Sequence, residues 1–580
     1  MPKSWQIMPK IDQTFINQFS QYDPILLQLL FNRGLIEPKE IEDFLSSDYS
    51  LLHHDPFLFR DMEAATDLII EKIKAGEKIV VYGDYDADGV TSSAILIEVL
   101  KILKAKTDIY IPNRVSEGYG LNKSAIKESS KAGAKLIITV DNGIRNKAEV
   151  EYVKSLGMEI IITDHHVPPP EKNELPDCLI INPIIQDETY PFKYLAGVGV
   201  ASKLALALIK KSKLTEEQKI KLENKILDLV AIGTVADCVT LLGENRILVK
   251  QGLEVLNKTN RLGLKELFKT AKINEKQKLD SWNIGFQISP RLNAAGRMDH
   301  ANTAYELLTT KDRDEAVKLS EGLNLRNQDR QKITEEIVKE IIDNQIKEPL
   351  KNKIIIAVSP SIYEKSQAWN EGIIGLVAGR ICEKYYLPTL VITGNSKDIK
   401  GSGRSIEEFN LIKTIEHLKN NLFKYGGHAA ACGFSIEGKE KLENFIKEIT
   451  EYANSNLGTI ELKPKLSIDA EIDFNDVNDD LIEILEKLMP FGEDNDRPVF
   501  VCRNVNVVDI MNMGIDGRHL KLKLRADNSK TRNALGFGQA EEWKAIKIND
   551  RIDIAFYADL NEFNGRREVQ LKIIDIKLLE

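Results

Sequence analysis

The sequence lacks the features that would place the chain in a membrane or in an oxidising compartment. It has no apolar run that approaches the ~18 residues of a membrane span. Its N-terminus, MPKSWQIMPKIDQTF, has no apolar run of the kind found in secretory signals. The five cysteines are scattered, without a CxxC pair or a zinc-ligand spacing. These absences predict a cytoplasmic protein with free thiols and no membrane association.

An excess of basic residues is also missing, because 79 Lys and Arg stand against 88 Asp and Glu, a net charge of −9. Proteins that bind nucleic acid only through bulk attraction are usually basic. Any nucleic-acid groove must therefore be a local basic patch, while a metal-binding carboxylate cluster can account for part of the acidity. The 580 residues exceed one hydrophobic core and predict roughly three or four domains.

Short apolar runs alternate with helical stretches from Lys78 onward, which predicts a doubly wound parallel sheet. A second, smaller α/β module starts at KIIIAVS, and the C-terminal part reads as short strands of the size of an OB-fold-like β-barrel. The predicted fold class is thus α/β, with two α/β lobes joined by a long helix and a C-terminal barrel. The expected boundaries are a helical segment at 1–55, the first lobe at 56–301, the connecting helix at 302–350, the second lobe at 351–457 and the barrel at 458–580.

Acidic residues and imidazoles stand where successive apolar runs of the first lobe end. In open parallel sheets, ligands bind outside the carboxyl ends of the strands, so separate segments deliver these side chains to one place. So many like charges would repel one another unless cations neutralised them. A mixed Asp and His set favours two Mn²⁺ or Mg²⁺ ions, a common device for phosphoester hydrolysis. The residues are Asp84, Asp86, Asp88, Asp141, Asp164, His165, His166 and Asp237.

Other interpretations of these motifs fit less well. DYDADG could begin an EF-hand loop, but the twelfth position is Ile95 instead of Glu and the motif follows a strand. Any single Asp could be a helix cap or a turn residue, an explanation that weakens for four acidic sites with a His pair among them. GVGVAS at 197–202 is similar to a dinucleotide fingerprint but lacks its final glycine, and we interpret it as helix-start packing.

Four motifs in order, GDYDADG, VDNG, TDHH and GTVAD, resemble those of the DHH phosphoesterases. Further segments resemble the RecJ exonuclease branch of that superfamily, namely SPRLNAAGRMDHANTA, WNEGIIGLVAGR, GSGRS, GGHAAACGFS and MPFGEDNDRPVF. The resemblance runs from about residue 25 to the C-terminus. It implies a DHH domain and a DHH-associated domain as the two lobes. It also implies an exonuclease that degrades single-stranded DNA from 5′ to 3′ to mononucleotides, with Mn²⁺ or Mg²⁺, in recombination and repair.

The resemblance also implies roles for individual residues. His166 would face the scissile phosphate as an electrostatic stabiliser or proton donor, and Asp164 would orient the imidazoles. Many DHH phosphoesterases have His where this chain has Tyr82, a poor Mn²⁺ ligand, so the exact ligand set stays open and Asp84 is the candidate for that position. The implied metal ligands are Asp84, Asp86, Asp141, His165 and Asp237, with Asp88 as a further candidate.

Single-stranded DNA, the implied substrate, needs groups that bind its backbone, and Arg and backbone amides are natural phosphate partners. Each candidate could instead have a purely structural role, as a surface-loop glycine, a salt-bridged Arg or part of an interdomain hydrogen-bond network. Lys alternation on one strand of the barrel fits a solvated face as well as a DNA-binding face. The candidates are Arg114, Ser402 and Arg404 for a terminal-phosphate pocket, Gly427 and His428 in GGH, Arg291, Asn293 and Arg297 in the cleft floor, and Arg518, His519, Lys521, Lys523, Arg525 and Phe537 in the barrel.

Two other functions remain open from the sequence. One is a DHH-type phosphodiesterase of short oligonucleotides or cyclic dinucleotides, although such relatives are generally shorter and lack the C-terminal β module. The other is a catalytically dead replication scaffold, against which the intact carboxylates of all four motifs argue. A single-strand-binding protein and a helicase are candidate protein partners, and we expect a monomer.

Overall fold

The computed structural model describes residues 3–46, 48–49, 53–274, 277–527, 529–563 and 566–579. The chain forms two compact units. The larger unit comprises His54–Asp237 and Gln251–Leu462, and the smaller unit comprises Met1–His53, Cys238–Lys250 and Lys463–Glu580. Among the residues described, no helix is both long and apolar enough to cross a membrane.

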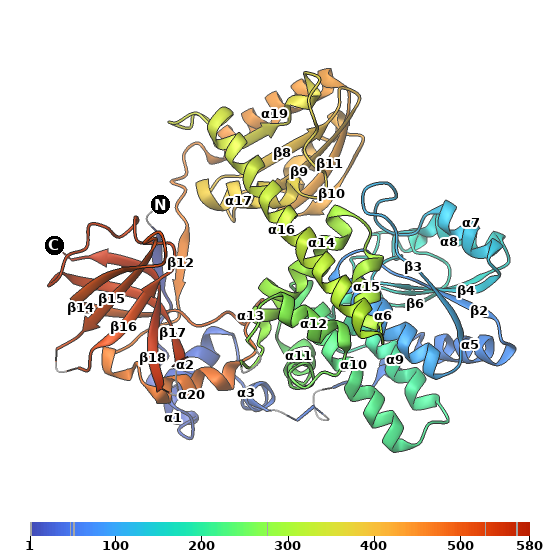
Figure 1. Cartoon of the computed structure of the whole chain (residues 1–580), viewed down its shortest axis with the longest axis horizontal. Helices are drawn as coiled ribbons and strands as arrows, with labels where there is room; N and C mark the ends of the chain where they lie inside the picture. Colours follow the sequence, from blue (N-terminus) through green and yellow to red (C-terminus); the bar gives the residue numbers. More distant parts are fainter. Residues whose placement is uncertain are drawn as a thin grey trace. The chain divides into compact units, whose positions relative to one another are not determined.

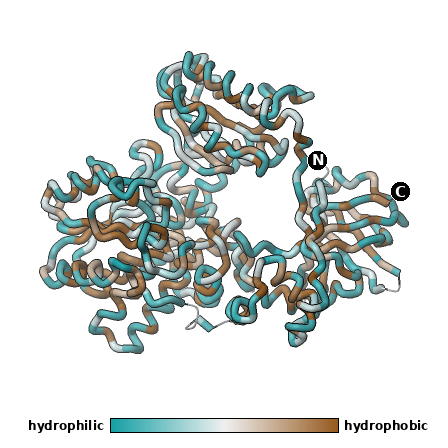
Figure 2. The backbone as a smooth tube through the Cα atoms, turned by 180° about the vertical axis from the view of Figure 1, so that it is seen from behind, coloured by the Kyte–Doolittle hydropathy of each residue, from teal (hydrophilic) through white to brown (hydrophobic). Residues whose placement is uncertain are grey.

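The first lobe of the larger unit is built on a parallel sheet with the strand order β3-β2-β4-β5-β6. Its strands are rich in β-branched residues and are mostly buried, as expected of a sheet covered on both faces. Figure 2 shows them as a largely hydrophobic band. This confirms the predicted parallel sheet. The bounds are β2 Lys78–Tyr82, β3 Lys106–Tyr110, β4 Ala134–Val140, β5 Glu159–Thr163 and β6 Leu179–Ile181.

Helices cover both faces of this sheet (Figure 1). Alternate strand residues such as Val80 and Ile160 share a core with α7 and α8, while α5, α6 and α9 contact the strands and α10 packs on α6 and α9. The chain leaves β2 toward β3 and then crosses back to β4, so a topological switch point lies at the carboxyl ends of β2 and β4. The bounds are α5 Met62–Ala75, α6 Ala87–Ile102, α7 Lys123–Lys131, α8 Lys147–Ser155, α9 Gly197–Lys211 and α10 Glu216–Ala236.

A helical segment connects the two lobes of the larger unit. The longest helix, α16 (Arg313–Asn344), has 32 residues, and the Asp312 side chain caps it by accepting a hydrogen bond from the amide of Glu315. This confirms the predicted connecting helix. The preceding elements are α12 Leu262–Thr270, α13 Ser281–Asn283, the π-helix η3 Ile284–Ile288, α14 Ser289–Met298 and α15 Asn302–Thr309.

The second lobe has a sheet with the order β10-β11-β9-β8-β7, in which β7 and β8 are parallel and the other pairs are antiparallel. Helix α17 packs on β8 and β9, and α19 packs on β11. The lobe is therefore α/β, as predicted. The bounds are β7 Ile355–Val358, α17 Ile374–Tyr385, β8 Thr389–Gly394, β9 Asp398–Arg404, α18 Leu411–His417, β10 Lys424–His428, β11 Ala431–Glu437 and α19 Lys439–Leu457.

The smaller unit contains the predicted barrel. Strand β14 pairs with both β15 and β17, which closes the ring β14-β15-β16-β18-β17. In β15, Leu520, Leu522 and Leu524 are buried while the alternating Lys and Arg residues are not. The OB-fold-like barrel is thus confirmed. The bounds are β13 Ala470–Glu471, β14 Phe500–Met513, β15 His519–Arg525, β16 Arg532–Gly536, β17 Arg551–Phe563 and β18 Arg566–Leu578.

Helices from both ends of the chain share the core of the barrel. Arg246, in α11 (Gly243–Leu256), is buried there and donates hydrogen bonds to the backbone carbonyls of Phe44, Lys487 and Leu488 at 2.7–3.1 Å. It thereby joins three distant segments of the smaller unit. The remaining elements are β1 Ser4–Ile7, which pairs in parallel with β12 Lys465–Ile468, and α1 Gln13–Gln18, α2 Pro24–Asn32, α3 Pro38–Leu45 and α20 Asp479–Leu488.

Candidate metal centre

The loop after β2 supplies three carboxylates with different surroundings. Asp86 caps α6, since its Oδ1 accepts a hydrogen bond from the amide of Asp88 at 2.9 Å. The two oxygens of Asp88 accept hydrogen bonds from the amides of Gly197 and Val198, both at 2.8 Å, at the start of α9. Asp84 is buried, and its Oδ1 has no hydrogen-bond partner. Asp84 therefore keeps a buried carboxylate oxygen that could coordinate a metal ion.

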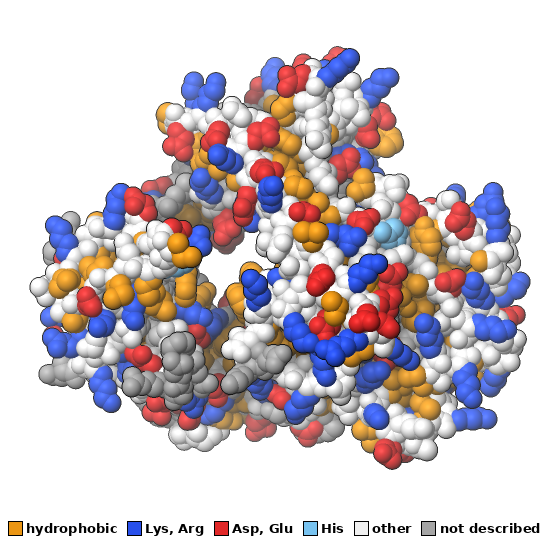
Figure 3. All heavy atoms as spheres, viewed as in Figure 1, with side chains coloured by type: hydrophobic (Ala, Val, Ile, Leu, Met, Phe, Trp, Pro, Cys, Tyr) orange, Lys and Arg blue, Asp and Glu red, His pale blue; other side chains and the backbone are white. Residues whose placement is uncertain are grey.

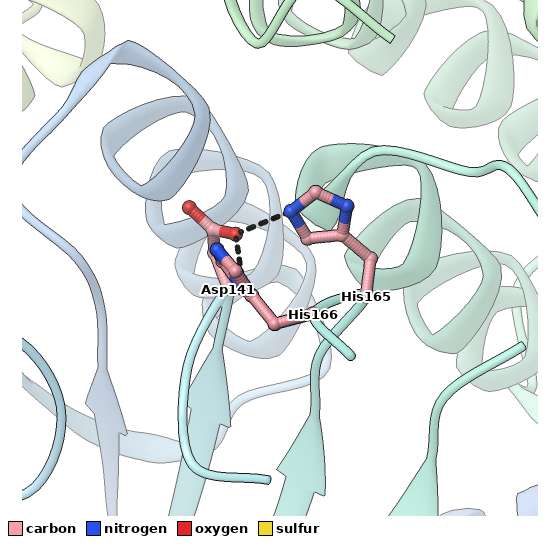
Figure 4. Close-up of side chains that lie close together, drawn as sticks. All are labelled: Asp141, His165 and His166. Carbon is pink, nitrogen blue, oxygen red and sulfur yellow. Dashed lines mark ion pairs between the residues drawn. The ribbon is translucent and has the colours of Figure 1, made fainter. Parts of the chain in front are cut away.

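The end of β4 and the turn after β5 bring an aspartate and two histidines together. Asp141 has a left-handed backbone (φ 63°), and its Oδ1 lies 3.2 Å from Nε2 of His165 and 3.8 Å from Nδ1 of His166 (Figure 4). Asp237, at the end of α10, places Oδ2 3.5 Å from Nε2 of His165. Three sets of potential ligand atoms, each set within 4.8 Å, come from Asp84, Asp86 and Asp141, from Asp88, His165 and Asp237, and from Asp141, His165 and His166.

Asp164 lies beneath the histidines and is fully buried. Its Oδ1 accepts hydrogen bonds from the amides of His165 and His166 and from Nδ1 of His166, at 2.8–3.1 Å, and its Oδ2 accepts one from the amide of Ile144 at 2.9 Å. Burial alone would raise the pKa of Asp164, but the hydrogen bond with His166 and the charge of that histidine hold this pKa below its ordinary value. This geometry suits a carboxylate that orients the imidazoles.

The electrostatics of the cluster suit divalent cations. Burial and neighbouring carboxylates raise the pKa of Asp84, Asp141 and Asp237 well above their ordinary values, and that of Asp88 to about 7. Burial, with the adjacent His166, lowers the pKa of His165 to about 4, so its imidazole is neutral. Neutral imidazole and carboxylate are the forms that bind metal ions.

Three buried atoms in this cluster lack hydrogen-bond partners, namely Oδ1 of Asp84, Oδ1 of Asp141 and Nε2 of His165. Buried polar atoms are nearly always paired, so such a group of unpaired atoms indicates a ligand that satisfies them. Oxygen donors with one or two imidazole nitrogens suit Mn²⁺ and Mg²⁺. The residues present therefore fit these ions.

Arginine side chains lie beside the acidic cluster. The Arg114 guanidinium lies 4.8 Å from the ring centroid of Tyr85, and Nη1 of Arg297 donates a hydrogen bond to the carbonyl of Gly372 at 3.0 Å. Burial, together with the charges of Arg114 and other arginines, lowers the pKa of Arg297 to about 10. Within the described ranges, Arg114, Arg297 and Arg404 form no ion pair with a carboxylate. Their charges remain available to phosphate groups.

Two of the three predicted terminal-phosphate residues, Ser402 and Arg404, lie on one face of the second sheet, whereas Arg114 belongs to the first lobe. Ser402 and Arg404 lie two apart on β9 and face the first turn of α17, where a Cβ on Gly375 would lie 3.0 Å from Ser402 Oγ and 3.3 Å from Arg404 Nη2. A helix N-terminus favours anions. In the sheet register, His428 and Arg404 are both level with Ala431, so they are two strand spacings, ~10 Å, apart. The segment Gly427–His428 is exposed.

Asn293 and Arg291, on α14, have partners within the protein. Oδ1 of Asn293 accepts a hydrogen bond from the amide of Ala87 at 2.7 Å and so anchors the start of α6. Arg291 donates to the carbonyl of Gln287 at 2.6 Å and to Oδ1 of Asn324 at 3.0 Å, both neutral acceptors. Asn293 thus lies beside the acidic loop, whereas the hydrogen bonds of Arg291 lead toward η3 and α16.

Helix α14 is closely packed on both sides. A Cβ on Gly296 would lie 2.5 Å from the carbonyl oxygen of Tyr85, in the acidic loop. A Cβ on Gly372, just before α17, would lie 2.6 Å from the carbonyl oxygen of Arg297. One helix therefore fills the space between the acidic loop and the start of the second lobe.

Comparison with known proteins agrees with this arrangement. The chain matches the family models for the DHH family N-terminal domain at residues 78–234, the DHHA1 domain at 331–455 and the RecJ OB domain at 468–575. It is 36% identical to the single-stranded-DNA-specific exonuclease RecJ of Bacillus subtilis, over 99% of this chain and 71% of that protein. It is 32% identical to its counterpart from Escherichia coli, over 96% of both chains. The chain belongs to the RecJ family.

Solved RecJ structures also resemble the chain. The crystal structure of RecJ from Thermus thermophilus in complex with Mn²⁺ superposes with a TM-score of 0.82, at 26% identity, over 100% of this chain and 80% of that one. The corresponding Mg²⁺ complex gives a TM-score of 0.75 at 25% identity, over 100% and 79%. The relatives thus bind the two cations that the donor set of this chain fits.

Of the two tyrosines at this RecJ-family site, Tyr119 was not predicted from the sequence and Tyr82 was predicted to be a poor ligand. Tyr119 places its hydroxyl 3.0 Å from Nδ1 of His166 and donates to the carbonyl of Asp141 at 3.0 Å. It lies five positions after Arg114 in the sequence. Tyr82 is buried, and its hydroxyl donates to the carbonyl of Gly120 at 3.2 Å instead of extending the acidic cluster.

Proposed function

We propose that this chain is a metal-dependent exonuclease specific for single-stranded DNA, which removes mononucleotides from the 5′ end in recombination and repair. The observation that carries the proposal is the meeting of three overlapping sets of Asp and His ligand atoms, each set within 4.8 Å. Arg114 and Arg297, which form no ion pair with a described residue, lie at its side. Asp84, Asp86, Asp141, His165 and Asp237 would hold Mn²⁺ or Mg²⁺, with Asp88 as a further candidate. Two such ions would supply an ionised water and stabilise charge on the phosphoryl oxygens.

The chain's own residues then position the substrate and move one proton. Burial alone would lower the pKa of His166, but its hydrogen bond with Asp164 raises it, so the imidazolium form persists to higher pH. Because Nδ1 faces Asp164, Nε2 of His166 is left to donate its proton to the O3′ leaving group of the terminal nucleotide. Tyr119, 3.0 Å from Nδ1, holds the ring from the other side.

The 5′ polarity follows from the basic pocket. A terminal phosphate carries more negative charge than an internal phosphodiester, and it suits a site with two guanidinium groups, a hydroxyl and a helix N-terminus. Arg114, Ser402, Arg404 and the start of α17 would form that site, and the segment Gly427–His428 would bind the phosphate from the exposed side. Arg297 and Asn293 would line the floor between this pocket and the metal ions.

The proposed function also includes the domain organisation of the chain, its location and its partners. The proposed modules are 1–55, 56–301, 302–350, 351–457 and 458–580. The barrel would bind single-stranded DNA through Arg518, His519, Lys521, Lys523, Arg525 and Phe537. Figure 3 shows basic and acidic side chains interspersed over the visible face, so a bound strand must depend on local groups. We expect a cytoplasmic monomer, supplied with strands by a single-strand-binding protein or a helicase, and its five scattered cysteines, which form no CxxC pair, suit a reducing compartment.

Digestion of a long single strand tests the function. With Mn²⁺, a 5′-phosphorylated strand labelled at its 5′ end should release labelled mononucleotide from the first turnover, and a blunt duplex should resist. His165→Ala should lose this activity without unfolding. Rapid cleavage of a dinucleotide alone would instead support the short-oligonucleotide phosphodiesterase. Mn²⁺ binding without any hydrolysis would support the inactive scaffold.

A further inference from the structure

Two large aromatic side chains are exposed side by side on the segment before α14. Trp282, in α13, is 54% exposed, and Phe286, in η3, is 68% exposed. Their ring centroids are 5.5 Å apart and their planes differ by 23°, so the rings are stacked. Single exposed apolar residues are common, but a stacked pair presents a continuous flat surface that marks a binding site.

The same segment has a well-filled inner face. Asn283, Ile284 and Ile288 are buried, and η3 packs on α10, near Val235. Asp280 caps the segment by accepting a hydrogen bond from the amide of Asn283. The π-turn of η3 widens the helix at this point, a feature that is frequent at functional sites. The buried inner face of the segment therefore holds the aromatic pair on the outside, where neither ring packs in the core.

Positive charge without an ion pair lies about one helical turn beyond Phe286, where Arg291 donates a hydrogen bond to the carbonyl of Gln287. Arg291 makes hydrogen bonds only to the neutral acceptors Gln287 and Asn324. Arg330 lies on α16, which packs on α14; it donates a hydrogen bond to Asn327 at 2.9 Å and keeps an Nε without a partner. Neither arginine forms an ion pair in the part of the chain that the structure describes. Aromatic rings beside such cations are the combination that binds single-stranded nucleic acid.

The segment also leads directly to the metal centre. Trp282 and Asn293 are eleven positions apart, roughly 16 Å of helix, and Asn293 anchors the start of α6 beside Asp86. We propose that Trp282 and Phe286 form a stacking platform for an unpaired base of the substrate, with Arg291 and Arg330 binding the adjoining phosphates. This proposal rests on the proposed function and adds a site outside its metal and terminal-phosphate groups. Only unpaired bases expose both faces, so the platform favours single strands.

The test measures how much the bases of a strand, as distinct from its phosphates, contribute to binding. Binding of a 5′-phosphorylated oligo(dT) in EDTA is compared with that of the same strand carrying abasic residues, for wild type, Trp282→Ala, Phe286→Ala and Trp282→Phe. The alanine variants should bind oligo(dT) about fivefold more weakly or worse and lose the preference over the abasic strand. Trp282→Phe should retain most of the affinity but lose the quenching of tryptophan emission. Tyr363→Ala, at an aromatic residue of the second lobe that is 51% exposed, should match wild type.

Activity with Mn²⁺ separates this proposal from the proposed function. The alanine variants should slow digestion of a long strand while they cleave a dinucleotide as wild type does. If they bind both strands as wild type does, the platform does not exist. Equal weakening on oligo(dT) and on the abasic strand would assign the pair to packing, and a change of oligomeric state would assign it to a protein contact. A wild type that cuts no strand would overturn the proposed function and the platform with it.

Discussion

Replacing Asp141 by Asn removes one charge from the acidic cluster and retains the shape of the side chain. Asn also tolerates the left-handed backbone at this position (φ 63°). In the metal-free protein, Asp141 Oδ1 has no hydrogen-bond partner, and burial and neighbouring carboxylates raise its pKa. We therefore expect the substitution to stabilise the metal-free protein at pH 8, where the carboxylates repel one another most.

The size of this effect follows from the pKa values. An acid whose pKa is raised in the folded state contributes stability below its unfolded pKa and loses it as the pH rises through the folded pKa. For Asp88 this window runs from 3.8 to about 7, a difference equivalent to ~4 kcal/mol. Besides burial, the charge of Asp88 is among the causes that raise the pKa of Asp141, so removing the Asp141 charge relieves part of the repulsion between the two carboxylates. A gain of about 1–2 kcal/mol is therefore expected at pH 8 and little at pH 4.

With Mn²⁺ bound, wild type should gain more stability than the Asp141→Asn protein. An ion present at 100 times its Kd stabilises a folded protein by ~2.7 kcal/mol, and its effect should grow from pH 5 to pH 8 because it displaces protons from the carboxylates. Asp141→Asn should lose most of this stabilisation. Thermal and denaturant unfolding with EDTA or Mn²⁺ measures both effects without any activity assay.

Asp187→Asn is a matched control, because Asp187 also has a left-handed backbone (φ 67°) but pairs with Lys172 on the surface. It should respond to Mn²⁺ as wild type does. The metal-site reasoning would be refuted by an Asp141→Asn protein that Mn²⁺ stabilises as much as wild type. A wild type that shows no Mn²⁺ effect at pH 8 would refute it equally.

Three further substitutions test separate parts of the structure. Asp164→Asn removes the carboxylate that accepts a hydrogen bond from Nδ1 of His166 at 2.8 Å. The kcat should fall roughly 10–100-fold, while calorimetry should show near-normal Mn²⁺ binding. A parallel loss of metal binding would contradict the positioning role of Asp164. Gly375→Ala crowds Ser402 and Arg404, so KM should rise several-fold for a 5′-phosphorylated strand and little for a 5′-hydroxyl strand. The control Gly379→Ala, whose Cβ would be 3.9 Å from the Arg404 side chain, should change neither KM value. Equal effects of the two substitutions would argue against the pocket. Arg246→Met leaves the carbonyls of Phe44, Lys487 and Leu488 without their hydrogen-bond donor. Denaturant unfolding should show that the free energy of unfolding of the smaller unit falls by about 3 kcal/mol. A loss below 1 kcal/mol would show that water replaces the guanidinium.

Much of the first lobe could be predicted because its strands are short, apolar and followed by acids. That pattern predicted the parallel sheet and the meeting of Asp84, Asp141 and His165. The order of pairing in the second sheet could not be predicted, because an apolar run of a few residues does not specify its neighbour. The antiparallel β9, β10 and β11 therefore appear only in the structure.

The separate roles within the acidic motif were also beyond the sequence. Asp84, Asp86 and Asp88 look equivalent by spacing, yet Asp88 uses both oxygens for amides more than one hundred positions away. Arg330 lies on a charged helix, where a solvated residue is the ordinary expectation, and only the packing of α16 on α14 brings it near Arg291. Contacts between distant segments decide such roles.

The close packing of α14 has a consequence for the size of the released fragment. Its backbone touches the acidic loop at Gly296 and the start of the second lobe at Gly372. Under the proposed function, the distance from the cleaved bond to the anchored chain end is then fixed by the width of a single helix. Product length would then depend on main-chain spacing, and substitutions of the side chains that bind the strand would change the rate of cutting without changing how much is cut off at each step.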